Sequence, residues 1–82
     1  MGRARRLLQQ AREKPHNFLF RDLIALAATA GFSLKRVRGD HHVLTHPELP
    51  EILVLQPRRG RAKPYQVRQL ITVIERHAIT LE

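Results

Sequence analysis

The sequence predicts an α+β fold, in which a three-stranded antiparallel sheet carries both main helices on one face. Three observations predict it: helical spacing of apolar residues over 20–30 and over 64–77, two strand-like segments joined by a two-residue turn, and a short apolar segment before the second helix. Consecutive strands with helices at both ends are typical of this class. A chain of 82 residues is expected to form one small domain.

A basic helix is expected ahead of this core, over residues 2–14. Its apolar residues fall at helical spacing and are Ala4, Leu7, Leu8 and Ala11. Because this stripe is narrow and surrounded by arginines, we expect a solvated helix at the periphery, and Pro15 disfavours its continuation. We therefore divide the chain into a basic helical extension, residues 1–15, and a main domain, residues 16–82.

Glycine and proline mark the ends of the two core helices. Gly31 can take a positive φ without penalty, so it suits the C-terminal end of the first one, with Phe32 folding back onto its last turn. Pro64 suits the first position of the last helix, where its missing N–H leaves no hydrogen bond unmade.

Residues 33–45 are predicted to form a hairpin around Gly39-Asp40. Glycine at the first central position of a two-residue loop suits a type II′ turn, whose twist matches the flanking strands. A loop with two prolines follows, and residues 51–56 form the third strand. This strand is apolar on both faces, so we expect helices to cover one face and a partner to cover the other.

The chain is strongly basic and contains no cysteine. Fifteen Lys and Arg residues against seven Asp and Glu give a formal net charge of +8, which predicts binding to a polyanion, nucleic acid first. The absence of cysteine excludes disulfides and thiolate metal sites and fits a reducing cytoplasm. No apolar run approaches the length of a membrane span, so we expect a soluble, cytoplasmic protein.

His41 and His42 follow the turn directly and lie opposite a basic strand. Imidazole can take or give a proton near neutral pH, and guanidinium binds phosphate. Metal-free cleavage of RNA needs these groups, since the 2′-OH of RNA attacks the adjacent phosphate and the protein supplies a base and cations. Adjacent strand residues point to opposite faces, so the two histidines are poorly placed to share a metal. We expect neither a metal nor another cofactor.

Two groups of basic residues could follow an RNA backbone. One group lies on the first strand of the hairpin, and the other on the loop before the last helix, whose free N–H groups favour an anion. The RNA-binding candidates are Lys35, Arg36, Arg38, Arg58, Arg59, Arg61 and Lys63. A flexible solvated loop is the alternative for the second group. Few aromatic residues are left to stack bases, which argues against an aromatic-platform RNA binder.

Three functions fit these features. The first is a metal-independent ribonuclease in which a histidine at the mouth of the hairpin is the general base or acid and arginines position the phosphates. The second is a non-catalytic RNA-binding module of the same fold. The third is a protein-interaction subunit that docks through its third strand. The residues alone do not choose among them.

Several motifs resemble one known family. They are Gly31-Phe32, Arg36, Gly39-Asp40-His41-His42-Val43 and His46-Pro47, and the segment from Leu55 to Gln69 is similar to a longer branch of the same family. This family is that of the HicA (YcfA-like) toxins, and the resemblance covers roughly residues 17–82. It implies a double-stranded-RNA-binding-domain-like fold, a type II toxin–antitoxin mRNA interferase, and neutralisation by a HicB antitoxin.

The resemblance also implies a catalytic residue. The family's catalytic histidine follows a Gly-Ser pair, which corresponds to His41 here, and in members written Gly-Ser-Asn-His it corresponds to His42. The family's serine is Asp40 in this chain. A carboxylate beside the histidine would either favour its protonated ring and hold it in place, or repel the phosphate, and both outcomes stay open.

Overall fold

The structure is a computed structural model that describes residues 2–82, and it confirms the predicted order of elements. The elements are α1 (Arg3–Glu13), the 3₁₀ helix η1 (Pro15–Asn17), α2 (Phe20–Thr29), β1 (Ser33–Arg38), β2 (His41–Thr45), β3 (Ile52–Leu55) and α3 (Pro64–Arg76). The segment Pro15–Asn17 forms a short 3₁₀ helix, so α1 ends before Pro15 as predicted.

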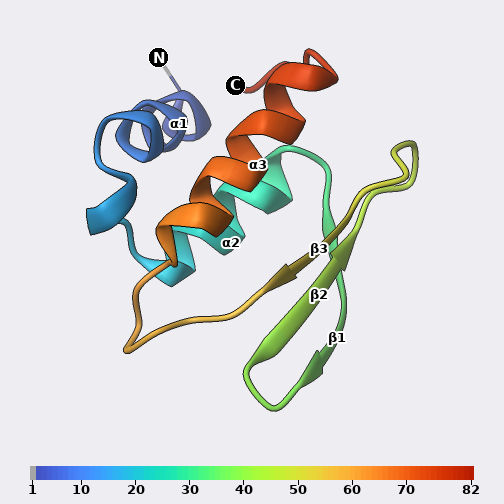
Figure 1. Ribbon diagram of the computed structural model, residues 1–82. Helices are drawn as coiled ribbons and strands as arrows, with labels where there is room; N and C mark the ends of the chain where they lie inside the picture. The colour runs from blue at the N-terminus through green and yellow to red at the C-terminus, as the bar shows by residue number, and fades with distance from the viewer. Residues whose placement is uncertain (1) are drawn as a thin grey trace.

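The sheet has the order β1-β2-β3, and both strand pairs are antiparallel. Figure 1 shows α2 and α3 on one face of the sheet, with α1 on the side of these helices that faces away from it. This α-β-β-β-α arrangement with an extra N-terminal helix is the predicted α+β fold. None of the helices in residues 2–82 combines the length and the apolar character that a membrane span requires.

Helix α1 lies at the periphery, but its apolar stripe belongs to the core. Ala4, Leu7 and Ala11 are buried in one cluster with residues of α2, α3 and the sheet. Arg12 donates to Glu75 Oε2 of α3 at 2.9 Å on the exposed side. The expectation of a solvated helix therefore holds only for its basic side, and the domain boundary after residue 15 stays a prediction.

Pairing across the sheet shows which side chains share a face. Leu44, Leu53 and Leu55 point toward the helices and are fully buried. Ile52 and Val54 point to the opposite, outer face and expose 59% and 43% of their surface. β3 is therefore apolar on both faces, as predicted, and within residues 2–82 only its helix side is covered.

β1 carries a bulge that the sequence did not indicate. Its register with β2 shifts between Leu34 and Arg36, so Lys35 is an extra residue without a cross-strand partner. Beyond the bulge, Val37 pairs with His42 and points to the helix side, as Leu34 does before it. Both apolar side chains are nevertheless exposed, because β1 is the strand that the helices do not cover (Figure 1).

Gly31 joins the end of α2 to β1. Its φ is +101°, and the Phe32 N–H donates to the Ala27 carbonyl at 3.0 Å, which is the hydrogen bond of a Schellman helix end. A Cβ at this position would lie 2.5 Å from Nε2 of His46. Glycine is therefore needed here for space as well as for its backbone conformation.

His46 holds the loop after β2 against the end of α2. Its Nε2 lies 3.1 Å from the Ala30 carbonyl, so this nitrogen carries the proton, and its Nδ1 accepts the Glu48 N–H at 3.0 Å. The ring also meets Phe32 edge to face, with 5.1 Å between ring centroids. His46 thus has a structural role.

We expect His46→Ala to lower the free energy of unfolding by about 1–3 kcal/mol, because it removes two hydrogen bonds from a partly buried site. Urea unfolding followed by circular dichroism measures the change. His16→Ala is the matched control, since His16 is exposed on η1. Equal losses in the two variants would contradict the role given to His46.

Glu51 connects the segment before β3 to the end of α3. Its Oε2 lies 2.8 Å from His77 Nε2 and accepts from Arg76 Nη1 at 3.2 Å. The hydrogen bond with His77 is the main cause that lowers the pKa of Glu51, and it outweighs the desolvation that raises it. A carboxyl group with a lowered pKa stabilises the fold while it is ionised, and this contribution is lost as the pH falls through its pKa in the folded state.

Glu51→Gln should therefore reduce stability most near neutral pH, with the difference from the wild type narrowing as the medium becomes acidic. Unfolding free energies compared at about pH 6 and about pH 3 measure this dependence. Glu13→Gln, on the exposed side of α1, serves as the control. A difference that stays constant with pH would show that the ionised Glu51 carboxylate does not contribute.

Candidate functional site

The hairpin turn places His41 at the first position of β2, at the end of the sheet where β1 and β2 are joined. Gly39 has φ +61° while Asp40 keeps a negative φ, the sign pattern of the predicted type II′ turn. His41 pairs with Arg38 across the hairpin, so both side chains lie on the outer face, which Arg36 shares. Directly opposite residues have Cβ atoms about 5 Å apart. The His41 side chain is 53% exposed.

His42 points the other way, toward α2. Its Nδ1 lies 2.9 Å from the Asp40 carbonyl oxygen, so Nδ1 carries the proton and Nε2 is the acceptor nitrogen of the neutral ring. The ring meets Phe20 edge to face, with 4.9 Å between centroids. The two histidines thus lie on opposite faces, as strand alternation predicts. Within residues 2–82, no group of three or more His, Cys, Asp or Glu side chains is arranged to hold a metal ion.

The side chain of Gln56 bridges the hairpin turn and the basic loop. Its Nε2 donates to both carboxylate oxygens of Asp40 at 3.1 Å, and its Oε1 accepts from Lys63 Nζ at 2.9 Å. The hydrogen bond from Gln56 is the main cause that lowers the pKa of Asp40, and the charges of His41 and Lys63 add to it. Asp40 Oδ1 also lies 3.4 Å from His41 Nδ1. The exposed carboxylate thus has one amide donor and two basic side chains, His41 and Lys63, in its vicinity.

A second glutamine, Gln66, holds the first one in place. It is only 3% exposed, and its Oε1 accepts the Gln56 backbone N–H at 3.1 Å. Its Nε2 donates to the Val54 carbonyl and the Tyr65 hydroxyl. Neither glutamine stood out in the sequence. One signal was present: Gln66 lies four residues before Leu70 on the apolar stripe of the last helix, where a polar residue needs buried partners.

The basic loop between β3 and α3 is a tight, hydrogen-bonded turn. The N–H groups of Arg58 and Arg61 each bond to the other residue's carbonyl, at 2.9 and 3.1 Å. Arg59 and Gly60 have φ of +54° and +77°, the signs of a type I′ turn. Arg61 also donates to Asn17 Oδ1 at 2.5 Å. The backbone of this segment is thus hydrogen-bonded, while the side chains of Arg58, Arg59 and Arg61 are exposed, and the choice between an RNA-binding loop and a flexible solvated loop stays a prediction.

A concave surface lies beside this turn, at the N-terminal end of α3. Its lining residues are His16, Arg58, Arg59, Arg61, Ala62, Lys63, Pro64 and Tyr65. Half of these residues are arginine or lysine, and the first N–H groups of a helix also favour an anion. The surface can therefore accommodate phosphate groups.

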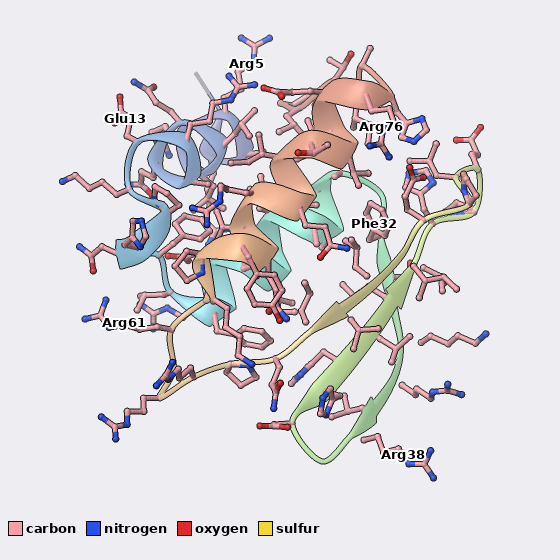
Figure 2. All side chains as sticks on the ribbon, viewed as in Figure 1. Arg5, Glu13, Phe32, Arg38, Arg61 and Arg76 are labelled. Atoms are coloured by element: carbon pink, nitrogen blue, oxygen red, sulfur yellow. The ribbon has the colours of Figure 1, made fainter. Side chains whose placement is uncertain are left out.

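The structure separates the predicted site residues into two groups at the same end of the molecule. The outer group consists of Arg36, Arg38 and His41, and the loop group of Arg58, Arg59, Arg61 and Lys63. Figure 2 shows Arg38 projecting from the end of the hairpin and Arg61 on the far side of the basic loop. Gln56 connects the groups through Asp40 and Lys63. Lys35 lies in the bulge. The roles assigned to all these residues stay predictions.

The fold and this end of the molecule define a small basic α+β protein that presents a histidine between cationic surfaces. A family model described as "HicA toxin of bacterial toxin-antitoxin" matches residues 20–76, from the first residue of α2 to the last of α3. The chain belongs to the HicA toxin family, which confirms the resemblance seen in its motifs. It is therefore a toxin of the toxin–antitoxin kind, and α1 lies outside the matched region. Comparison with curated proteins and with solved structures found no match.

Gln56→Leu should raise the pKa of Asp40 toward its ordinary value, because it removes the donor to both carboxylate oxygens. Titration of the Asp40 side-chain carboxyl by nuclear magnetic resonance measures the shift. Gln9→Leu is the control, since the Gln9 amide donates to Glu13 on the exposed side of α1. If the pKa of Asp40 is the same in Gln56→Leu as in the wild type, the hydrogen bonds from Gln56 do not lower it.

Proposed function

We propose that this protein is the toxin of a type II toxin–antitoxin system and cleaves mRNA in the cytoplasm as a metal-independent endoribonuclease. The observation that carries the proposal is the exposed imidazole of His41, which shares the outer face of the sheet with Arg36 and Arg38. Membership of the HicA toxin family supports the toxin role. The net charge of +8 supports a polyanionic substrate.

In this proposal His41 is the general base that acts on a 2′-OH of the RNA. The proton passes from O2′ to the imidazole, O2′ forms a bond to the adjacent phosphorus, and the P–O5′ bond breaks. The leaving O5′ takes a proton from solvent water and departs as a hydroxyl. The guanidinium groups of Arg36 and Arg38 stabilise the charge that builds up on the phosphate oxygens. The products carry a 2′,3′-cyclic phosphate and a 5′-hydroxyl. No metal is required, because the RNA supplies its own nucleophile.

The loop group binds the RNA backbone away from the cleavage point. Its cations line the concave surface at the start of α3, and the Gln56 bridge fixes Lys63 relative to the turn that carries His41. Such contacts do not depend on the base sequence, and each neutralised phosphate of a single strand contributes about 0.7 to the slope of log affinity against log salt concentration.

The protein partner in this proposal is a HicB-like antitoxin that covers the outer face of the sheet. The apolar side chains of Ile52 and Val54 are exposed there, on the same face as His41. A partner that buries these side chains would also block access to the imidazole. An antitoxin that docks on β3 would therefore inhibit cleavage through the same contact.

Replacement of the proposed base tests the activity. His41→Ala should reduce cleavage of a purified single-stranded RNA at least about hundredfold, since positioned general bases contribute about 10²–10⁴-fold to rates. The growth inhibition caused by expression of the protein should disappear with it. Gel analysis of the RNA in the presence of a chelator measures cleavage, and the wild type should retain its activity there.

His77→Gln, at the opposite end of α3, is the matched control and should leave cleavage unchanged. Thermal unfolding of both variants checks that each is folded. Cleavage retained by pure His41→Ala would refute the role of His41. Salt-dependent RNA binding by the wild type without any cleavage product would instead identify a non-catalytic RNA-binding relative.

A further inference from the structure

A second cavity lies on the helix side of the hairpin, across the sheet from His41. Its lining residues are Leu19, Phe20, Arg21, His42, Pro57 and Gly60. Three of these residues have apolar side chains, Gly60 has none, and Arg21 and His42 provide the polar groups. Leu19 is exposed although it is apolar. The cavity thus has carbon-rich walls and only two side chains that can make hydrogen bonds.

The ring of His42 is a fixed wall of this cavity. Its Nδ1–H donates to the Asp40 carbonyl at 2.9 Å. The ring also makes an edge-to-face contact with Phe20, with 4.9 Å between the two ring centroids. Asp40 itself is held by Gln56. With Nδ1 engaged, the neutral ring can offer only Nε2 as an acceptor. A flat aromatic ring held in this way presents a surface against which another flat ring can pack.

We propose that this cavity binds a nucleobase of the single-stranded RNA substrate. A base has two apolar faces and a polar edge, which correspond to the apolar walls and to the groups of His42 and Arg21. The inference rests on the proposed function for its ligand and assigns His42 a role distinct from that of His41. His42 packs against a base, whereas His41 transfers the proton.

The surroundings of the cavity favour RNA over an apolar protein segment. Pro57 and Gly60 belong to the basic loop, so the cavity adjoins the concave surface lined by the loop group. A base in the cavity would therefore have its own phosphates beside arginines and lysine. Arg21 adds a further positive charge at the rim. This charge complementarity fits a nucleotide chain that runs from the loop group to the hairpin.

Binding of two matched probes tests the proposal. The first is a short single-stranded RNA with 2′-O-methyl groups, which cannot be cleaved, and the second has the same backbone without bases. Stacking of one base on a protein ring makes about a tenfold difference in affinity, so the wild type should prefer the first probe by about this factor or more. Fluorescence anisotropy measures both affinities.

Substitutions in the cavity should change the preference for the probe with bases according to the side chain that they leave. His42→Ala and Leu19→Ala should reduce it severalfold toward equal binding of the two probes, while His42→Phe, which keeps an aromatic ring, should retain it. Leu34→Ala is the matched control, since Leu34 is an exposed leucine of β1 outside the cavity.

Two results would overturn the proposal. Equal affinity of the wild type for both probes would show that no base is bound, and capture of an apolar antitoxin peptide weakened by Leu19→Ala, with RNA binding unchanged, would assign the cavity to a protein. If His42→Ala fails to fold, the preference of Leu19→Ala for the probe with bases tests the proposal instead. Base-dependent binding in a wild type that cleaves nothing would refute the proposed function and keep the base site.

Discussion

The pairing of β2 on both of its edges is the constraint on which the site depends. As the central strand it is held in register by β1 and by β3, and a slip of one residue would exchange its two faces. In the observed register, His41 faces solvent beside arginines and His42 faces Phe20. The different surroundings of two chemically identical neighbours therefore follow from backbone hydrogen bonds, and not from contacts that either histidine makes for itself.

The Gln56 bridge connects the hairpin turn to the buried core. Gln66 is buried on α3, it binds the backbone of Gln56, and the Gln56 side chain holds both Asp40 and Lys63. A carboxylate beside the proposed phosphate site would repel phosphate if it stood alone. Here the Asp40 carboxylate accepts two hydrogen bonds from the Gln56 amide, and the nearby positive charge of Lys63 also lowers its pKa. Asp40 Oδ1 lies 3.4 Å from His41 Nδ1, which is close enough to orient the ring, and the choice between the two alternatives for Asp40 stays a prediction.

Local chemistry in the sequence was sufficient to predict the elements. Gly31 and Pro64 mark helix ends through their own backbone preferences, and Gly39 marks the turn in the same way. The bridge through Gln56, the cavity beside His42 and the contact of His46 with α2 could not be predicted, because each joins segments that only the tertiary fold brings together. Family membership was foreseen from motifs, whereas the roles of single side chains depend on distances that motifs do not contain.

The bulge at Lys35 has a consequence for the behaviour of the protein without a partner. β1 is a free sheet edge, and its apolar residues Leu34 and Val37 are exposed on one side. Such an edge can recruit a strand from another copy and begin aggregation. The extra residue interrupts the regular spacing of donors and acceptors, and its ammonium group, with Arg36 nearby, repels an identical edge. This irregularity therefore disfavours pairing of the β1 edge with the same edge of a second copy of the chain.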